Sequence, residues 1–535
     1  MMSQTNFPNK LNDELHINDI EFSKEDITEL LQNLKPDKSP GPDQLHPKML
    51  KHCTSLAEPL LIIFKKSLDY GLLPDDWKCS NVSPIFKKGS KSQTCNYRPV
   101  SLTSIICKLL ETLIKQKLCI HLSNNALLSN HQHGFMSGRS CLSNLLETFE
   151  CWTDALDNGN RVDCVYLDFK KAFDSVPFQR LLLKLRGYGV NGKVLRWIES
   201  FLTGRKMRVG VRGSFSQWAS VSSGVPQGSV LGPLLFLIYV NELPDLFDCS
   251  SKIFADDTKV WTIIKDEEDC ENLQNDLKKI SEWSNDWLLR LNTEKCKVMH
   301  ICTARKKDSF VPYQYKMGDN DNEHVLETVE SEKDLGIHVT DTLNPSKQCA
   351  EAVLKANKII RIIQRSFRYI DEDSILILYK TYIRPHLEYN TQAWSPYTKK
   401  DIMLLEGVQK RVSKLVPKLK NLPYEDRLKS LGLTTLEDRR TRGDLIETFK
   451  ILKGISNVDH RQFFVIDNSR RLRGHSLKLS KPRVNSQLRL QFYSQRVITL
   501  WNRLPQLVID AESVNTFKNR LDDYHKKNGF GSKIV

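Results

Sequence analysis

The sequence predicts an α+β fold up to about residue 345 and a helical fold after it. Before Pro345, strand-like and helix-like segments mix without the strict alternation that a doubly wound parallel sheet would need. After Pro345 the strand pattern fades, and apolar residues recur at helical spacing from Val353 to Phe367. The chain has 535 residues, of which 40% are hydrophobic and 27% charged. This balance is typical of a folded protein and excludes a fibrous or wholly disordered one.

The first elements are predicted to be helices. Residues 1–24 are polar and are expected to form a disordered leader. Ser23 can cap the first helix, because Asp26 follows three residues later and leucines recur behind it. Residues 35–43 contain three prolines and a glycine and must form a loop, and helical periodicity returns over 47–71.

Strands are predicted where short β-prone runs lie between turn residues. Such runs occupy residues 82–86, 162–169, 295–302 and 335–339. Two further runs, 253–255 and 258–263, flank Asp256 and Asp257, which predicts a hairpin with the two aspartates at its turn. A helix is expected over 177–188.

The charge of the chain suggests a polyanionic partner. The net charge is +15, and residues 401–535 hold 27 Lys and Arg against 14 Asp and Glu, so nearly all of the excess lies in the last quarter. A near-neutral body with a basic tail is a common layout for enzymes that bind nucleic acid. A merely soluble basic surface is the alternative.

Composition also excludes several classes of protein. The 13 scattered cysteines argue against a disulfide framework. The sequence contains no CxxC pair, which argues against a structural zinc site. Cys296, His300 and Cys302 come closest to a ligand set, but buried residues on a strand explain them better. The longest apolar run, 230–240, is half of the roughly 20 residues that span a bilayer, and residues 1–14 lack a signal-peptide core. We therefore expect an intracellular protein with no membrane partner.

Carboxylates stand where two predicted strands end. Asp168 closes one strand, and Asp256 and Asp257 lie in the hairpin turn. A carboxylate in an apolar strand context is unfavourable unless it is paired or binds a metal. If the three converged, divalent cations would relieve their repulsion, and two such ions can stabilise a phosphoryl transfer. An Asp-Asp pair alone is common in turns, so the argument depends on the segments around it.

Those segments form an ordered series. They are residues 38–43, 96–102, 132–135 with 138–140, 168–174, 224–233, 254–257, 291–295 and 335–336. In this order and spacing they resemble the reverse transcriptases of non-LTR (LINE-type) retrotransposons, nearest to the Jockey and chicken-repeat clades. The likeness is strong over 25–345 and continues to residues 501–505 and 517–518, which resemble the usual close of such elements.

The resemblance implies a right-hand polymerase fold and RNA-directed DNA polymerisation. Fingers and palm would occupy 25–345, a helical thumb 346–420, and a basic nucleic-acid-binding region 421–535. The implied partners are an RNA template, a DNA primer, the RNA–DNA hybrid and deoxynucleoside triphosphates. The implied location is the nucleus, although no clear targeting segment is present.

The resemblance also implies roles at the reacting centre. Asp168, Asp256 and Asp257 would hold two Mg²⁺ ions, with Mn²⁺ as a possible substitute. Phe173 would be the steric gate against a 2′-hydroxyl. Lys295 would protonate the leaving pyrophosphate, with Lys297 as the alternative.

Further implied roles concern the nucleotide and the nucleic acid. Gln227 and Gly228 would lie under the incoming nucleotide and the template base. Arg98 would grip the triphosphate, assisted by Lys87 or Lys88. Arg139 would contact the backbone of the template or primer. Leu335 and Gly336 would begin the element that grips the primer strand.

The sequence departs from the usual pattern in several ways. Within the given sequence we expect neither the endonuclease that usually precedes such a polymerase nor a Cys-His knuckle or ribonuclease H block after it. Met136-Ser137 replaces the Arg-Pro that is more often found there. A truncated, catalytically silent nucleic-acid-binding relic is therefore the second hypothesis. A relative of intron maturases or telomerases is the third, and the segment 501–505 argues against it.

Overall fold

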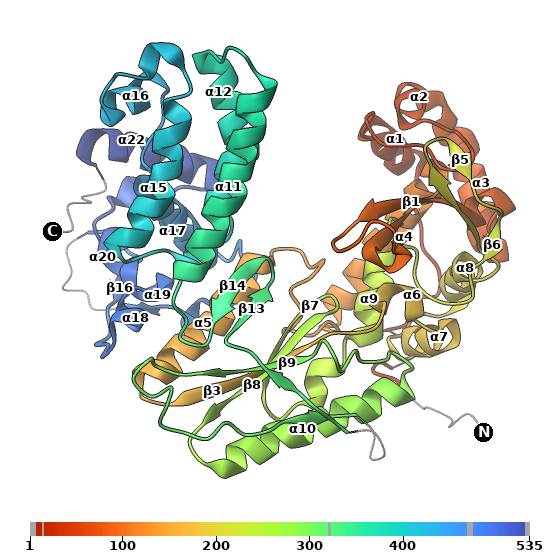
Figure 1. Ribbon diagram of the computed structural model, residues 1–535. Helices are drawn as coiled ribbons and strands as arrows, with labels where there is room; N and C mark the ends of the chain where they lie inside the picture. Colours follow the sequence, from red (N-terminus) through yellow and green to blue (C-terminus); the bar gives the residue numbers. More distant parts are fainter. Residues whose placement is uncertain (1–6, 13–14, 319–322, 468–473, 530–535) are drawn as a thin grey trace.

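The computed structural model describes residues 7–12, 15–318, 323–467 and 474–529. Two arms rise from a central sheet (Figure 1). The arm at the right contains the first helices and a smaller sheet, and the arm at the left, coloured green to blue, is helical. A long helix, α10 (Glu267–Asp286), runs along the other side of the central sheet.

The central sheet has five strands in the order β12-β9-β3-β8-β7. Strands β9, β3, β8 and β7 pair antiparallel with one another in this order, and β12 pairs with β9 in parallel. Their bounds are β3 (Arg161–Leu167), β7 (Ser250–Phe254), β8 (Asp257–Ile264), β9 (Lys297–Ile301) and β12 (Glu327–Thr328). Val165 packs into a core shared with α10, whereas Cys164 packs into a core shared with helix α5 (Cys141–Asp157). Alternate residues of the strand thus face two different helical layers.

The right-hand arm is built on a second sheet. Its strands are β1 (Cys79–Phe86), β2 (Tyr97–Leu102), β4 (Lys206–Val211), β5 (Ser214–Phe215) and β6 (Ala219–Ser220). Helices surround it, among them α1 (Lys24–Gln32), α3 (Ala57–Tyr70), α4 (Ile105–Asn124), α7 (Phe178–Gly187), α8 (Gly192–Leu202) and α9 (Gly232–Val240). Helix α9 is apolar on all sides and almost entirely buried, so it joins this arm to the central sheet.

The N-terminal segment packs against this body, in contrast to the predicted disordered leader. Phe7, Ile20 and Phe22 are buried. The Ile17 amide donates a hydrogen bond of 2.8 Å to the carbonyl of Gly189. The described part of residues 1–24 is therefore held by apolar burial and backbone hydrogen bonds, which the polar composition of the segment conceals.

The left-hand arm consists mainly of helices that pack around one continuous core. Its longer helices are α11 (Ser346–Ser366), α15 (Lys399–Ser413), α17 (Leu436–Leu452) and α22 (Val514–Asn528), with α12 (Glu372–Leu378) and α16 (Tyr424–Ser430) between them. Ile360 and Leu405 share this core with Leu445 and Phe517, so it extends across residue 420. The arm docks on α5 through a buried ion pair between Arg489 and Glu150.

The strand expected over residues 335–339 is instead a hairpin. Strands β13 (Ser331–Asp334) and β14 (Ile337–Thr340) pair antiparallel, and Leu335 and Gly336 form the turn with φ of +42° and +92°. The other predicted strands and the aspartate hairpin are confirmed in outline. Across the described ranges, every helix falls short of the length or apolar character that a membrane crossing demands. The predicted α+β class and right-hand arrangement are confirmed, with the arms as fingers and thumb and the central sheet as palm.

Candidate active site

Strand register brings the three predicted carboxylates to one edge of the palm. Leu167, the last residue of β3, pairs with Thr258, so Asp168, which follows it, lies beside Asp257 at the start of β8. Phe254 pairs with Asp257, which leaves Ala255 and Asp256 as a two-residue turn. Ala255 has φ of +59°, as such tight hairpins require.

The charges of these groups act on one another. Burial, then the charges of Asp256, Asp334 and Asp168, raise the pKa of Asp257 to about 6. The pKa of Asp256 is also raised, by burial and by Asp168, and the cations Lys87 and Arg98 oppose this rise. A cluster of carboxylates that destabilise one another's charge is suited to binding a cation.

Asp168 is held by the loop before β9. The Asn292 side-chain amide donates to one carboxylate oxygen of Asp168 over 3.1 Å, and Lys295 Nζ lies 3.4 Å from the same oxygen. Lys297 instead forms an ion pair with Glu327. Of the two lysines left open by the sequence, Lys295 is therefore the one at the carboxylates. Asn292 was not predicted, although it lies inside one of the singled-out segments.

The aspartate turn is braced from behind by a buried glutamine. Gln132 Oε1 accepts hydrogen bonds from the amides of Gly134, over 2.7 Å, and Ala255, over 2.9 Å. A Cβ on Gly134 would lie 2.5 Å from the Ala255 nitrogen, so only glycine permits this approach. The guanidinium of Arg139 donates to the carbonyls of Asn130 and Gln132, which places it within this bracing loop.

Next to Gln132, the side chain of His133 is fully buried. It hydrogen-bonds Ser143 over 2.8 Å and lies 3.4 Å from Glu147, which also pairs with Lys252 of β7. Burial lowers the pKa of His133 to about 4. This cluster ties α5 to the strand that carries the aspartate turn.

Phe173 lies in the short helix α6 (Ala172–Ser175), five residues after Asp168. Its ring stacks on Phe236 of α9 with centroids 4.3 Å apart, and the exposed Phe135 meets it edge-on at 6.3 Å. Because it is only partly buried and its ring is fixed by these contacts, Phe173 presents a rigid apolar surface.

The loop that carries Gln227 and Gly228 is locked to both fingers and palm. The Ser101 amide of β2 donates to the Gln227 carbonyl over 2.7 Å, and the Val225 amide donates to the Phe173 carbonyl over 2.8 Å. Gly228 has φ of +112°, and a Cβ there would lie 2.5 Å from the Ser101 oxygen. Glycine is required at this position for both reasons.

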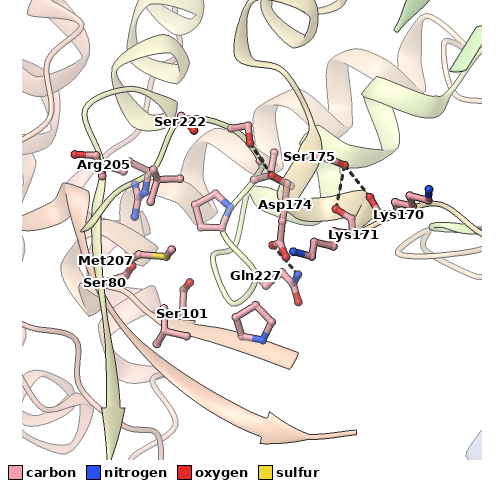
Figure 2. A pocket seen from close by; sticks show the side chains of 18 of the residues that line it. Ser80, Ser101, Lys170, Lys171, Asp174, Ser175, Arg205, Met207, Ser222 and Gln227 are labelled. Atoms are coloured by element: carbon pink, nitrogen blue, oxygen red, sulfur yellow. Dashed lines mark hydrogen bonds between the residues drawn. The ribbon is translucent and has the colours of Figure 1, made fainter. Parts of the chain in front are cut away.

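A cavity of about 640 Å³ lies beside the loop that carries Gln227 (Figure 2). Its lining includes Ser101, Lys171, Asp174, Arg205 and Gln227. The cavity therefore borders the predicted nucleotide site, but the three aspartates predicted to bind metal do not line it.

Two predicted cations reach the site from the fingers. Arg98 lies on β2 opposite Ile85, and Lys87 follows the end of β1, where its amide bonds the Asn96 carbonyl over 2.8 Å. Both side chains are exposed, and both act electrostatically on Asp256.

Leu335 and Gly336 form the tip of the β13–β14 hairpin. The Tyr389 hydroxyl of the helical arm donates to the Leu335 carbonyl over 3.1 Å. Asp334, at the base of the turn, forms a buried ion pair with Lys259 of β8. This hairpin thus connects the thumb to the strand that begins at Asp257.

No group of three or more Asp, Glu, His or Cys side chains in the described ranges forms a metal site on its own. Cys296 and Cys302 are buried, and His300 lies 2.9 Å from the Asp163 carboxylate. All three residues are buried, His300 on β9 and the two cysteines directly before and after that strand.

Comparison with known proteins shows which family the central part of the chain resembles. Residues 85–349 match the family described as reverse transcriptase (RNA-dependent DNA polymerase). The chain is 26% identical over 406 residues to a probable RNA-directed DNA polymerase from transposon X-element of Drosophila melanogaster, covering 74% of this chain and 44% of that protein. It is 30% identical over 283 residues to the RNA-directed DNA polymerase from mobile element jockey of the same species, covering 51% and 31%. The chain therefore spans less than half the length of these relatives.

Proposed function

We propose that this chain, whose residues 85–349 form a reverse transcriptase domain of the non-LTR retrotransposon type, copies RNA into DNA by extending a primer. One observation carries the proposal: Asp168 and the Asp256–Asp257 turn meet at one edge of the palm sheet, and Arg98 and Lys87 act on them from the fingers. This combination can hold a cation and a polyphosphate together.

Reverse transcriptases depend in general on divalent metal ions, and the donor set of this chain fits them. Asp168, Asp256 and Asp257 would hold two Mg²⁺ ions, since carboxylates with raised pKa values lose their mutual repulsion when a cation binds. When bound, the ions would lower the pKa of the primer 3′-hydroxyl and neutralise the charge that develops on the phosphates. Mn²⁺ accepts the same ligands.

The remaining residues of the site orient the nucleotide. Arg98 and Lys87 bind the triphosphate, because a guanidinium matches phosphate oxygens in a bidentate geometry and a lysine adds a point charge. Lys295, beside Asp168, supplies a proton to the departing pyrophosphate. Phe173 closes the space that a 2′-hydroxyl would need, so deoxynucleotides are preferred.

The arms hold the nucleic acid. The Leu335-Gly336 turn contacts the primer strand, and the basic helices of 346–420 follow the phosphates of the RNA–DNA hybrid without reading its sequence. Residues 421–535 hold most of the excess positive charge and bind structured RNA or target DNA through backbone and shape. Arg139 acts on the aspartate turn rather than on the template, because its guanidinium is engaged within the loop. Copying into chromosomal DNA would take place in the nucleus.

Primer extension tests the proposal. Purified protein would be given poly(rA)/oligo(dT), dTTP and Mg²⁺, beside an Asp256→Ala, Asp257→Ala double variant. We expect extension by the parent chain and none by the variant, with equal affinity of both for the duplex. A folded parent chain that binds the duplex but adds no nucleotide would refute the proposal and support the silent relic.

A further inference from the structure

The helical arm contacts the loop that braces the aspartate turn. The amide of Asn457, in the loop after α17, donates a hydrogen bond of 2.8 Å to the carbonyl of Gly138. Gly138 belongs to the bracing loop, residues 130–140, which also carries Gln132 and Arg139. This contact therefore joins the C-terminal part of the chain to the loop behind the predicted reacting centre.

The contact is so close that it requires a glycine. Gly138 has φ of +74°, and a Cβ on it would lie 3.0 Å from the Asn457 Cβ and 3.2 Å from the Asn457 nitrogen. Carbon atoms in favourable contact lie about 3.5–4.0 Å apart. Any side chain at position 138 would therefore push the two backbones away from each other.

The arm side of the contact is held firmly. The amides of Ile455 and Ser456 both donate to the Lys450 carbonyl of α17, over 2.8 Å and 3.1 Å. The Ser456 side chain is buried, and its hydroxyl donates to the Glu447 carboxylate over 2.9 Å. Residues 455–457 are thus fixed to the end of α17 and can support the palm.

On the palm side, a series of hydrogen bonds leads from Gly138 to the aspartate turn. The guanidinium of Arg139 donates to the Gln132 carbonyl over 3.0 Å and to the Asn130 carbonyl. Gln132 Oε1 in turn accepts from the amide of Ala255, the first residue of the turn, over 2.9 Å. A displacement of Gly138 would therefore move the groups that hold the turn.

The arm has a second attachment to α5 that does not involve the bracing loop. The Asp157 carboxylate, at the end of α5, accepts hydrogen bonds from the amides of Asn485, over 3.0 Å, and Ser486, over 2.6 Å. Because α5 has 17 residues and rises about 1.5 Å per residue, this attachment lies about 25 Å from the other end of the helix. The arm is therefore docked on the palm independently of Gly138.

We propose that residues 455–457 are a positioning element that holds the aspartate turn in place through their contact with Gly138. They act through Arg139 and Gln132 and do not touch the nucleotide. The consequence for catalysis rests on the proposed polymerase function, whereas the effect on the turn itself does not. The predicted reacting centre would then depend on a segment outside the matched residues 85–349.

Gly138→Ala tests the proposal, because the new Cβ forces residues 138 and 457 apart. Amide hydrogen exchange would be followed by mass spectrometry in the peptide 250–258, which contains the Ala255 amide. We expect exchange there to become at least about threefold faster than in the parent chain. Single-turnover addition of dTMP at saturating dTTP should slow by about fivefold to fiftyfold, while the Kd for the primer–template duplex stays within about twofold.

Two variants supply matched controls. Gly159→Ala adds the same methyl group at a positive φ of +81°, just after α5, where the new Cβ would meet only Lys306 Nζ, at 3.7 Å. Asp157→Ala loosens the arm at its second attachment. Both should lower thermal stability but leave the exchange of peptide 250–258 and the rate of addition at the parent values. If Gly138→Ala does not fold, Ser456→Ala replaces it, because it frees the loop from Glu447 and should act in the same direction.

The outcomes separate this inference from the proposed function. Unchanged exchange in peptide 250–258, or an equal slowing of addition by Asp157→Ala, would overturn the positioning role while leaving the polymerase intact. Faster exchange with an unchanged rate of addition would overturn it as well, because the turn would then need no support. A parent chain that adds no nucleotide would overturn the polymerase function, and the exchange measurement would still decide whether the arm holds the turn.

Discussion

Replacing Gly228 by alanine should disable the nucleotide loop without unfolding the protein. The residue has φ of +112°, and its new Cβ would lie 2.5 Å from the backbone oxygen of Ser101. Because that oxygen belongs to a fingers strand, the loop must move instead. The movement would break the 2.7 Å bond from the Ser101 amide to Gln227.

The size of the effect follows from two contributions. Alanine at such a φ costs about 1–3 kcal/mol, and the lost hydrogen bond adds about 1 kcal/mol. A total of about 2–4 kcal/mol corresponds to a roughly 30-fold to 900-fold fall in the population of the seated loop. We expect kcat/KM for dTTP to fall by at least about tenfold on this basis.

Gly213→Ala is the matched control. Gly213, in the turn between β4 and β5, also has a positive φ, of +85°, but a Cβ there meets nothing within 4 Å. It should show a similar loss of thermal stability and unchanged primer extension. If Gly228→Ala extended primers within twofold of Gly213→Ala, the argument that the Ser101 contact seats the loop would be wrong.

Three other changes test separate parts of the structure. Phe173→Ala should let UTP compete with dTTP, raising UTP incorporation relative to dTTP by at least about tenfold, and an unchanged ratio would contradict the gate. Arg489→Met should lower the free energy of unfolding by about 3–5 kcal/mol, because it leaves the Glu150 carboxylate buried and unpaired. In denaturant titrations, the Arg489→Met, Glu150→Gln double variant should recover most of the lost stability. His133 has a folded pKa of about 4, below its usual 6.5, so its contribution to stability is complete above pH 6.5 and is lost as the pH falls towards 4. Between pH 7 and 4.5 this lowers the free energy of unfolding by about 2 kcal/mol, and His133→Gln should abolish that pH dependence. The Glu147 pKa of about 2 keeps that carboxylate ionised across this range.

The aspartate hairpin could be predicted because the residues that specify it are adjacent in the sequence. Two β-prone runs separated by a turn carrying Asp256 specify the hairpin. The order of the surrounding motifs gave the resemblance to reverse transcriptases, and residues 85–349 match that family. The α+β class followed from the change of periodicity near Pro345 in the same way.

The partners of the site residues could not be predicted, because they come from distant segments. Gln132 reaches Ala255 across 123 residues, and Asn292 reaches Asp168 across 124. The turn at Leu335 was missed for another reason: leucine rarely adopts a positive φ, so its sequence pattern indicated a strand.

The N-terminal segment was also missed, although it contains the necessary residue. Phe7 is an isolated apolar side chain in a polar stretch, with no periodicity to mark it. It packs on Tyr188 and Trp287, with ring centroids 5.5 Å and 5.8 Å away. Burial of this kind is decided by the shape of the folded palm and cannot be seen in the local sequence.

Single-turnover addition of one dTMP to an oligo(dT) primer on poly(rA) tests the central claim most directly, with Asp256→Asn as the comparison. This variant keeps the shape of the side chain and removes its charge. The structure predicts equal thermal stability and equal duplex affinity for both proteins, with addition by the parent chain only. Addition at the same rate by both would show that the carboxylates at the palm edge are not the reacting centre.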